Sequence, residues 1–428
     1  MKVLVIGSGG REHALCWALS RSPQLRELYC APGNAGIAAV ADLVPIAPEE
    51  IHQLADFAAD LKIDLTVVGP ELPLSLGIVD EFQSRGLAIF GPRQRAAQLE
   101  SSKVFAKEFM QRHGIPTAPF EVAHDAHEAR QAALGFGLPV VLKAEGLASG
   151  KGVLIVSSDD ELEAALQVLF DERRFGAASD RVVVEAFLEG EEASFIGISD
   201  GKHLLPMATS KDYKRIGDGD VGPNTGGMGA HSPSIVLGGD QAAEVVEKVM
   251  RPVVEGMAAE GSPFAGVLYA GVILTADGPK VLEFNVRLGD PEAQALLLRL
   301  EDDLLTVLSQ AAAGSFRLSR LSFRKEAAVC LVMASAGYPG KPTKGEVIEG
   351  LDQAAAQEGV VVFHAGTARR GQDFVTAGGR VLNVCATGTQ LVDALKRAYD
   401  ASKLIHWPGK VLRRDIGRRV LQGPRRPA

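Results

Sequence analysis

The first hundred residues alternate short apolar runs with segments of helical periodicity, and this alternation restricts the fold more than any other feature. Ile51–Lys62 has apolar residues at helical spacing and fits between two of the apolar runs. Four buried strands are predicted, over Val3–Ile6, Glu27–Cys30, Leu65–Val68 and Ala88–Phe90. Strands that alternate with helices predict an open, doubly wound parallel sheet.

The middle of the chain continues with further strands and helices. A helix is predicted over Leu99–His113, before the breaker Gly114-Ile115-Pro116. Strands are predicted over Val140–Lys143, Val153–Val156, Arg181–Phe187, Leu268–Leu274 and Lys280–Asn285, and helices over Glu161–Glu172, Gln241–Glu260 and Glu292–Leu308. The polar, glycine-rich stretch Asp212–Gly229 has no periodicity, so we expect a long loop that is either functional or disordered.

A new series of strands begins at about Ala327. Ala327–Met333, Val360–His364 and Arg380–Ala386 are predicted strands, which indicates a separate small α/β domain. The end of the chain is rich in arginine and is expected to be a solvated tail rather than a binding patch. Its arginines are Arg413, Arg414, Arg418, Arg419, Arg425 and Arg426.

Composition limits the possible function classes. At roughly 100–200 residues per domain, 428 residues suggest two to four packed units. The net charge of -8 argues against a broad nucleic-acid or membrane surface, and no stretch approaches the roughly 18 apolar residues of a membrane span. The four scattered cysteines fit no disulfide framework or zinc pattern. The opening MKVLVIG is too short for a signal peptide, so we expect a cytoplasmic protein.

A glycine-rich turn, Gly7-Ser8-Gly9-Gly10-Arg11-Glu12, follows the first predicted strand and opens a helix. Glycines at this place let backbone N–H groups and the helix N-terminus face a phosphate. Glu12 replaces the third glycine of a dinucleotide fingerprint, and Ala31-Pro32-Gly33-Asn34 lacks the acid that would hold a ribose. The pattern therefore favours a small phosphate over NAD, with a tight turn of purely structural purpose as the alternative.

A second glycine-rich stretch, Gly146–Gly152, has the sequence GLASGKG. It is one residue shorter than a P-loop, and Gly152 replaces the Ser or Thr that would bind Mg²⁺. It also lies between two strands rather than before a helix. A hairpin here, with Lys143 at its base and Lys151 at its tip, could fold over a triphosphate. A flexible surface hairpin with solvated lysines is the alternative.

Glu283 and Asn285 are the candidate metal ligands. Alternate side chains of a strand share a face, so Glu283 and Asn285 project together while Leu282 and Phe284 pack on the other side. Carboxylate and amide oxygens suit Mg²⁺, which also keeps phosphates and waters as ligands. A solvent-facing polar stripe is the alternative. Beyond them, Arg287 could bind a carboxylate, and Asp290 before Pro291 is a predicted helix N-cap.

Motifs spread over the whole chain make the resemblance specific. The chain contains, in order, GSGGREHA at 7–14, APGNAG at 31–36, VGPE at 68–71, KAEGLASGKGV at 143–153, EAFLEGEEASF at 185–195, KDYKRIGDGDVGPNTGGMGAHSP at 211–233, LEFNVRLGDPE at 282–292, FHAGT at 363–367 and DIG at 415–417. Together they resemble the phosphoribosylamine–glycine ligase family. PNTGGMGA is highly specific, whereas GxGG alone would be weak.

The resemblance implies an α/β protein with an ATP-grasp fold, in which the nucleotide lies between two β-rich lobes. An N-terminal doubly wound parallel-sheet domain at 1–102 would take the phosphoribosylamine side. The ATP-grasp region would span 103–325, with 120–188 as its small ATP-binding lobe, and a small C-terminal α/β domain would span 326–428. The family joins glycine to 5-phosphoribosylamine, giving the glycinamide ribonucleotide, ADP and phosphate.

The resemblance also implies roles for individual residues. Lys103 and Lys143 would contact phosphates, under a hairpin around Ser149, Gly150, Lys151 and Gly152. Glu185, Ala186, Phe187 and Leu188 would bind adenine through their backbone, and Glu192, with Glu191 left open, would hold the ribose. Lys143, Lys151 and Arg287 would be catalytic. The amine and glycine would contact Gly9, Gly10, Arg11, Glu12, Gly33, Asn34, Pro70, Glu71, Asp212, Lys214, Asn224, Thr225, Gly226, Gly227, Met228 and Arg287.

ATP and a metal ion, Mg²⁺ or Mn²⁺ held by Glu283 and Asn285, are the implied cofactors. Many relatives in the wider superfamily have another acidic ligand on the preceding strand, but Leu268–Leu274 has none, which leaves the number of ions open. The expected partners are small molecules, with no nucleic acid and no membrane, and the chain is expected to be a monomer or weak oligomer. A ligase for a different amine, an NAD-dependent dehydrogenase and a nucleotide sensor without activity are the alternatives.

Overall fold

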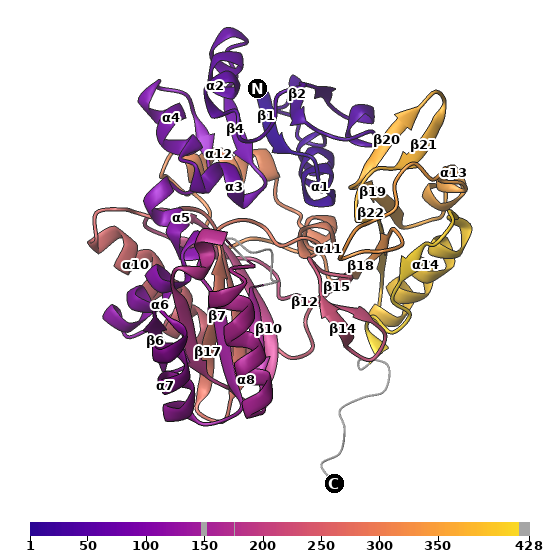
Figure 1. The fold of residues 1–428 in the computed structure, drawn as a ribbon. Coiled ribbons are helices and arrows are strands. Elements are labelled where there is room, and N and C mark those ends of the chain that lie inside the picture. The colour runs from indigo at the N-terminus through magenta and orange to yellow at the C-terminus, as the bar shows by residue number, and fades with distance from the viewer. Residues whose placement is uncertain (147–151, 175, 419–428) are drawn as a thin grey trace.

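The computed structural model describes residues 1–146, 152–174 and 176–418, and its chain forms several β-sheets with helices packed against them (Figure 1). The N-terminal sheet has the order β3-β2-β1-β4-β5, and its neighbouring strands are parallel. Its strands are β1 (Lys2–Gly7), β2 (Glu27–Pro32), β3 (Asp42–Leu43), β4 (Leu65–Val68) and β5 (Ile89–Phe90). The helices of this region are α1 (Gly10–Leu19), α2 (Ile51–Asp60), α3 (Glu71–Ser75) and α4 (Ile78–Ser84).

The prediction of a doubly wound parallel sheet is confirmed. Leu4 and Ile6 of β1 belong to one hydrophobic cluster, which includes Leu54 of α2. Val3 and Val5 belong to a second cluster on the opposite face, against α1. Because alternate residues of a strand point to opposite faces, a continuous apolar strand needs a layer of structure on both sides.

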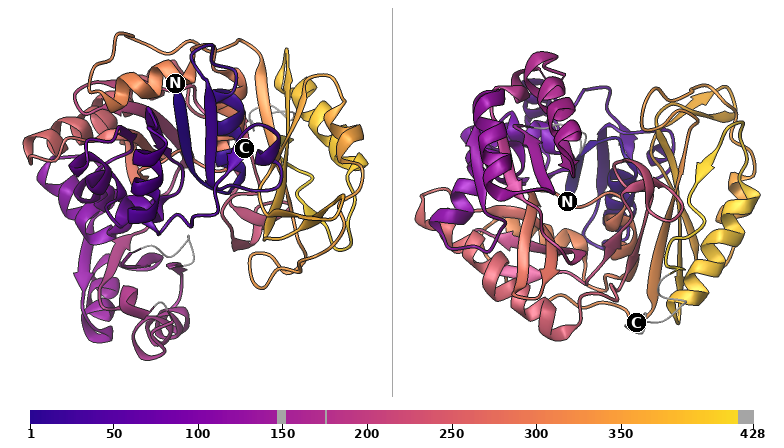
Figure 2. Two further views of the ribbon diagram at one scale, coloured as in Figure 1. Left: turned by 90° about the horizontal axis from the view of Figure 1, so that it is seen from above. Right: turned by 60° about the horizontal axis from the view of Figure 1, so that its bottom comes forward.

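The second sheet, with the order β6-β9-β7-β8, is antiparallel and has its own core beneath α7 (Ala126–Phe136) and α8 (Asp159–Leu166). Its strands are β6 (Phe120–Ala123), β7 (Val140–Ala144), β8 (Val153–Val156) and β9 (Val182–Ala186). Figure 2 shows that this lobe projects from the body of the molecule. A π-helical turn, Gln167–Asp171, extends α8 at the end of the predicted helix Glu161–Glu172.

The third sheet has the order β11-β10-β16-β17 and is also antiparallel. Its strands are β10 (Glu191–Asp200), β11 (Leu204–Pro206), β16 (Ala265–Thr275) and β17 (Gly278–Asn285). The helices next to it in the chain are α5 (Gln94–Ser101), α6 (Lys103–Arg112), α9 (Gly239–Val245) and α10 (Arg251–Ala259), with a π-helical turn, Val246–Met250, joining α9 to α10. A bridge between Thr117 and Val281 attaches the start of the second lobe to β17.

The fourth sheet combines the end of the chain with two strands from its middle. Its path is β12-β15-β18-β22-β19, and β23 also pairs with β18. These strands are β12 (Lys211–Asp212), β15 (Gly229–Ser232), β18 (Ala327–Ala334), β19 (Val360–His364), β22 (Arg380–Gly388) and β23 (Val411–Leu412). Helix α14 (Leu391–Leu404) covers the outer face, while α11 (Glu292–Arg299) and α1 pack against this sheet from within the molecule (Figures 1 and 2). Residues 211–212 and 229–232 are thereby built into the C-terminal sheet.

Two predicted helices are interrupted, and both interruptions are caused by capping residues. Ser102 adopts an extended backbone and its hydroxyl accepts the Phe105 N–H, so Leu99–His113 is divided between α5 and α6. Asp303 caps α12 (Leu304–Ala312) in the same way, which separates it from α11. A side-chain oxygen that satisfies the first free N–H groups starts a new helix at that residue.

Three further predictions are wrong. Asp212–Gly229 is not a structureless loop, because it contains the hairpin of β13 (Arg215–Gly217) and β14 (Val221–Asn224). Asp290 is not the N-cap of α11, which is Pro291, and its carboxylate pairs with Arg380 instead. Arg413 is not solvated, because its side chain is buried between Asp220 and Asp415. Arg414 and Arg418 are exposed, and the remaining arginines of the expected tail, Arg419, Arg425 and Arg426, lie outside the described residues.

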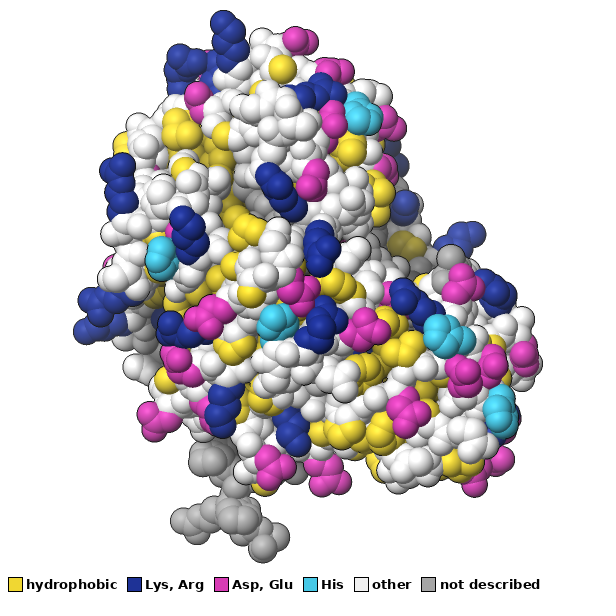
Figure 3. All heavy atoms as spheres, turned by 90° about the vertical axis from the view of Figure 1, so that its left-hand side faces the viewer, with side chains coloured by type: hydrophobic (Ala, Val, Ile, Leu, Met, Phe, Trp, Pro, Cys, Tyr) yellow, Lys and Arg dark blue, Asp and Glu magenta, His cyan; other side chains and the backbone are white. Residues whose placement is uncertain are grey.

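The small hairpin β20 (Thr367–Arg370) to β21 (Asp373–Thr376) and the short helices η1 (Ile37–Ala39), η3 (Gly176–Ser179) and α13 (Leu351–Ala355) complete the described elements. In the part of the chain that the structure describes, no helix has the length and apolar character needed to cross a bilayer. On the face seen in Figure 3, Lys and Arg side chains are interspersed with Asp and Glu rather than gathered by sign.

Candidate active site

Glu283 lies at the centre of a group of cations, and β17 presents it. Its side chain is 44% exposed and lies 3.5 Å from the Lys214 ammonium. Burial raises the pKa of Glu283, but Lys214, Lys143, Lys103 and Arg287 outweigh burial and hold that pKa below its ordinary value. We call these five residues the open cluster. Four cations therefore converge on one partly exposed carboxylate, which places their N–H donors near a surface that an anionic ligand can reach.

The predicted alternation along β17 is only partly correct. Phe284 packs into the core, as expected. A bulge pairs Gly271 with Glu283 but Val272 with Val281, so Leu282 has no strand partner and does not join the core. The Leu282 carbonyl instead accepts a hydrogen bond from the Lys143 ammonium at 2.8 Å. The bulge therefore places Lys143, a predicted phosphate-binding residue, against the backbone of β17, the strand that contains the predicted metal ligands.

Lys143 and Lys103 of the open cluster, and Lys107 beside them, are held by nearby acceptors. Lys143 Nζ lies 2.8 Å from Glu185 Oε1, and Lys107 Nζ lies 2.9 Å from Glu185 Oε2. Burial lowers the pKa of Lys107 to about 8, although Glu185 opposes this effect. Lys103 Nζ donates to the Gly146 carbonyl at 2.7 Å, at the start of the glycine-rich stretch. The Glu185 side chain is thus buried and paired with two lysines. The sequence analysis expected only the backbone of Glu185 to act, by binding adenine.

Arg287 has several partners at once. Its Nε lies 3.2 Å from Glu71 Oε2, and one NH2 lies 2.9 Å from both Glu100 Oε1 and Asn285 Oδ1. Burial raises the pKa of Glu100 to about 7, against the opposing charge of Arg287, and Glu100 also accepts the Val286 N–H at 2.7 Å. The guanidinium therefore links the N-terminal region to the end of β17, beside both predicted metal ligands.

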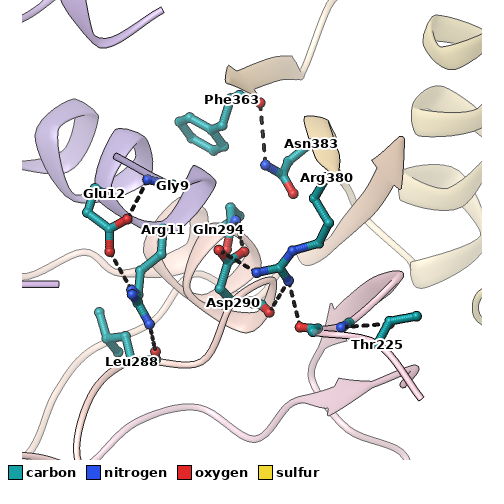
Figure 4. A network of polar contacts seen from close by, with 12 residues as sticks. Gly9, Arg11, Glu12, Thr225, Leu288, Asp290, Gln294, Phe363, Arg380 and Asn383 are labelled. Carbon is teal, nitrogen blue, oxygen red and sulfur yellow. Dashed lines mark hydrogen bonds and ion pairs between the residues drawn. The ribbon is translucent and has the colours of Figure 1, made fainter. Parts of the chain in front are cut away.

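The glycine-rich turn at the start of α1 is closed by protein contacts, as Figure 4 shows. The Gly9 N–H donates to Glu12 at 2.6 Å, while Arg11 pairs with Glu12 at 2.6 Å and donates to the Leu288 carbonyl at 3.0 Å. A Cβ on Gly10 would lie 2.0 Å from the Asn383 amide nitrogen, so glycine is needed for close packing there. Glu12, which replaces the third glycine, fills the space of the turn.

The Asn34 side chain likewise forms hydrogen bonds within the protein. Its amide nitrogen donates to the carbonyls of Ser8 and His364, and its oxygen accepts the N–H groups of Gly36 and Ile37. Gly33 beside it has a φ of +68°, a conformation that favours glycine. Pro70 is a different case, since it precedes Glu71 and starts α3 with its extended backbone, which directs Glu71 toward Arg287.

The segment 212–228 supplies one cation of the open cluster and several structural groups. Burial lowers the pKa of Lys214, but Asp212, Glu283, Tyr269 and Glu192 outweigh it and hold that pKa well above the ordinary value. Asp212 accepts a hydrogen bond from the Ser194 hydroxyl at 3.2 Å.

The end of this segment belongs to the framework around the site. Thr225 donates to the Lys214 carbonyl through both its N–H and its hydroxyl, each at 2.8 Å. Gly226 donates its N–H to the Tyr338 hydroxyl, and its carbonyl accepts from Arg380. Asn224 ends β14, Gly227 has a φ of +112°, and Met228 is completely buried. The fully buried Met228 side chain faces the core rather than an open site.

The predicted nucleotide-binding residues lie on β9, on β10 and between these strands. The Ala186 N–H already donates to the Pro119 carbonyl, whereas the Phe187 side chain is 38% exposed. Leu188 follows at intermediate exposure, and Glu191 and Glu192 are exposed at the start of β10. The negative charge of Glu192 helps to raise the pKa of Lys214, so Glu192 lies on the side of the open cluster. Gly152 leads into β8, while the predicted residues Ser149, Gly150 and Lys151 lie outside the described residues.

Four residues of this region were missed by the sequence analysis. Lys107 follows Lys103 by one helical turn, a spacing that places both on one face and could have identified it. Glu100 and Arg380 had no such signal, since their partners Arg287 and Asp290 are distant in the chain. Glu292 begins α11, and burial, followed by the charge of Asp212, raises its pKa to about 7. In the described ranges, no group of three or more His, Cys, Asp or Glu residues could hold a metal ion by itself.

The two antiparallel sheets lie within residues 101–293, which match an ATP-grasp (A) domain model, so this part of the chain is an ATP-grasp domain. The solved structure of biotin carboxylase from Campylobacter jejuni in complex with β-γ-ATP shares this fold with a TM-score of 0.74 at 16% identity, over 96% of this chain and 92% of that chain. The prediction of an α/β protein with the ATP-grasp fold is therefore confirmed.

The chain belongs to the phosphoribosylglycinamide synthetase family. The N-domain model of this family matches residues 1–100, the ATP-grasp (A) domain model 101–293 and the C-domain model 328–419. The phosphoribosylamine–glycine ligase of Mesorhizobium japonicum is 50% identical over 97% of this chain and 98% of its own length. That of Vibrio cholerae is 49% identical over 98% and 99%. The crystal structure of the Thermotoga maritima ligase has a TM-score of 0.83 at 35% identity and covers 97% of this chain and 100% of that chain.

Proposed function

We propose that this protein joins glycine to 5-phosphoribosylamine at the expense of ATP, giving N1-(5-phosphoribosyl)glycinamide, ADP and phosphate in purine biosynthesis. The observation that carries the proposal is the open cluster, in which Lys214, Lys143, Lys103 and Arg287 surround the single carboxylate of Glu283. A triphosphate and a carboxylate substrate are anions that such a concentration of charged N–H donors suits. The relatives named above support the choice of glycine and phosphoribosylamine.

The chemistry needs ATP because a carboxylate is a poor electrophile. A glycine carboxylate oxygen attacks the γ-phosphorus, the bond to the β–γ bridging oxygen breaks, and ADP leaves. The amine of phosphoribosylamine then attacks the carbonyl carbon of the glycyl phosphate, the carbon–oxygen bond to phosphate breaks, and the amine loses a proton. Positioning and charge neutralisation supply most of the rate in such transfers.

Different residues bind ATP and glycine. Lys103 and Lys143 bind the phosphates of ATP together with the glycine-rich stretch that contains Ser149, Lys151 and Gly152. Phe187 and Leu188 bind adenine, and Glu192 binds the ribose, a choice that its effect on Lys214 supports. Arg287, held by Glu71, orients the glycine carboxylate, for which a planar fork of donors is suited.

A divalent metal ion, Mg²⁺ or Mn²⁺, completes the site. Glu283 offers a partly exposed carboxylate and Asn285 an amide oxygen on the same face of β17, a set of hard oxygen donors that fits Mg²⁺. When bound with ATP, the ion neutralises charge on the transferring phosphoryl group. Two protein oxygens suit an ion that keeps phosphate and water ligands.

The domain roles, the assembly and the location complete the proposal. Residues 1–102 provide the phosphoribosylamine side, 103–325 form the ATP-grasp region with 120–188 as the small lobe, and 326–428 form the C-terminal domain. The chain acts as a monomer or weak oligomer on small molecules, without nucleic acid. Four buried free thiols, Cys16, Cys30, Cys330 and Cys385, support the cytoplasm as its location.

The test is a coupled assay of ADP formation that omits one substrate at a time. ADP production should require ATP, glycine and phosphoribosylamine together, and other amines should not replace phosphoribosylamine. With ¹⁸O in the glycine carboxylate, the released phosphate should contain the label, because that oxygen joins carbon to phosphorus in the intermediate. AMP and pyrophosphate as products would overturn the mechanism, and turnover with another amine alone would favour a ligase of different specificity.

A further inference from the structure

The segment Arg413–Gly417, which includes the DIG motif, contains a completely buried arginine. The Arg413 side chain has 0% exposure and forms a bidentate pair with Asp415, at 2.8 and 2.7 Å. It also donates to Asp220 at 2.7 Å and to the Arg215 carbonyl at 3.1 Å. Asp220 and Arg215 belong to the β13–β14 hairpin, so a single guanidinium joins the end of the described chain to a segment about two hundred positions earlier.

The backbone of the 413–417 segment continues this contact. Asp415 accepts the Gly219 N–H at 2.8 Å, and the Arg414 N–H donates to Asp218 at 2.7 Å. The Gly417 N–H donates to the Tyr213 hydroxyl at 3.0 Å. The hairpin is therefore held by side chains and backbone alike, from Tyr213 to Asp220.

Two of these contacts lie on either side of Lys214. Tyr213, which precedes it, is held by Gly417, and Arg215, which follows it, is held by Arg413. The Lys214 carbonyl is itself bonded to Thr225. The Lys214 ammonium lies 3.5 Å from Glu283, in the open cluster. Fixing both neighbours of a residue restricts the direction in which its side chain can point.

We propose that Arg413 is a positioning residue for the ligase reaction, which holds the backbone around Lys214 so that its ammonium faces Glu283 and the anionic substrates. This inference rests on the proposed function of the open cluster. Arg413 is too deeply buried to touch a substrate, so its effect passes through Lys214. Burying an arginine with two carboxylates gains little stability over an apolar contact of similar size, whereas its multiple directed bonds specify one position of the hairpin.

The experiment compares Arg413→Met in two backgrounds, the native protein and Lys214→Ala. In the native background, kcat should fall roughly 10- to 100-fold, as expected for a misplaced group near the reacting atoms. The KM for ATP should change by less than about 2-fold, because Lys103 and Lys143 are held by other contacts. In the Lys214→Ala background, Arg413→Met should lower kcat no further. A purely structural role would lower kcat by the same factor in both backgrounds.

Arg130→Met is the matched control. Arg130 forms a bidentate pair with Glu163, at 2.7 and 2.6 Å, on exposed parts of α7 and α8. Its removal should leave kcat within about 2-fold of the native value. Tyr213→Phe provides a second, milder test because it removes only the acceptor of the Gly417 N–H and leaves every charge paired. It should lower kcat roughly 3- to 10-fold, and it decides the question if Arg413→Met does not fold.

The outcomes separate this inference from the proposed function. If Lys214→Ala has native kcat, the assignment of the open cluster is wrong, and the inference falls with it. If Lys214→Ala is impaired while Arg413→Met, or Tyr213→Phe in its place, keeps native kcat, only the positioning role is overturned. Equal further losses of kcat in both backgrounds would also overturn that role.

Discussion

The open cluster around Glu283 and the network at the start of α1 contain the same kinds of residue but differ in how far their central ion pairs, Lys214–Glu283 and Arg11–Glu12, are exposed. In the second region, which we call the closed network, Arg11 pairs with Glu12 and Arg380 with Asp290. Arg380 also donates to the carbonyls of Gly226 and Asp290, and Gln294 donates to Asp290 (Figure 4). Each charged group there meets an opposite charge or a backbone partner within the protein.

Exposure distinguishes the two regions, whereas the pKa values of their carboxyl groups Glu283 and Asp290 are both lowered. Burial raises the pKa of Asp290, but Arg380, Arg11 and Gln294 outweigh it and keep that pKa below its ordinary value. The side chains of Arg11 and Glu12 are 8% and 3% exposed, whereas those of Lys214 and Glu283 are 35% and 44% exposed. Directed pairing in the interior holds one arrangement of the chain, while charged groups at an accessible surface remain available to a ligand. Motifs rich in glycine and charge occur in both regions, so the motif alone does not distinguish them.

The largest effect is expected for Glu283→Ala in the open cluster. Turnover should fall about 10⁴-fold, equivalent to roughly 5 kcal/mol, because the charge balance around the transferring phosphoryl group and one metal ligand are lost. ADP formation at several Mg²⁺ concentrations measures the effect, and urea unfolding should show a stability near that of the native protein. Near-native turnover at low Mg²⁺ would mean that the metal assignment is wrong.

In the closed network, Arg380→Met should act on stability instead. Removing the arginine leaves the Asp290 carboxylate buried without its charged partner, which should lower the free energy of unfolding by roughly 4 kcal/mol. Arg130→Met, which breaks an exposed pair, should lower it by less than about 1 kcal/mol. Urea unfolding compares the two variants. Equal stabilities would contradict the view that complete pairing at the start of α1 maintains the fold.

The next prediction concerns how stability depends on pH through the Glu100 carboxyl, which pairs with Arg287 of the open cluster. Burial raises its pKa from the ordinary 4.5 to about 7, so the folded protein holds this proton more tightly than the unfolded chain. Ionisation therefore reduces stability as pH rises from about 4.5 to about 7. Glu100→Gln, neutral throughout, should gain roughly 3 kcal/mol relative to the native protein across this window.

The measurement is urea unfolding of both proteins at pH 4.5, 6 and 8. Glu292, whose pKa is also raised to about 7, is present in both proteins, so its contribution largely cancels in the difference. A stability difference that does not change with pH would show that Arg287 neutralises Glu100 fully and that its pKa is not raised.

The sequence predicted those parts of the fold that depend on local periodicity. The strands Leu65–Val68, Val153–Val156 and Val360–His364 have the predicted bounds, because each is a short apolar run between breakers. The helix breaks at Ser102 and Asp303 were missed, since a capping residue inside an apolar pattern looks like any other polar position. The β13–β14 hairpin was missed because polar, glycine-rich strands have no alternation to detect.

The candidate site was predictable where two residues share a strand or a helix turn, as Glu283 and Asn285 do. Contacts between distant segments were not predictable by the same reasoning. Asp290 has the local pattern of an N-cap, but its carboxylate pairs with Arg380, ninety positions away in the chain, instead of capping α11. Arg413 lies in an arginine-rich stretch that resembles a solvated tail, and only the tertiary structure places it beside Asp220. At these positions, contacts between distant segments of the chain determine the partner of each side chain, and the local sequence pattern does not.

The smallest expected effect separates charge from geometry within the open cluster. Arg287→Lys keeps the positive charge near Glu283, but an ammonium cannot reproduce the fork that reaches Glu71, Glu100 and Asn285 together. We expect kcat/KM for glycine to fall about 30-fold, or roughly 2 kcal/mol. Arg287→Met, which removes the charge as well, should lose more.

Arg130→Lys is the control, because it makes the same exchange in an exposed bidentate pair and should leave kcat/KM within about 2-fold of the native value. If Arg287→Lys retains native kcat/KM, positive charge alone is sufficient at this position. The open cluster would then differ from the closed network only in its exposure, and the directed bonds of Arg287 would have no part in orienting glycine. A 30-fold loss would instead show that both regions depend on the geometry of an arginine, one to hold the fold and the other to hold a substrate.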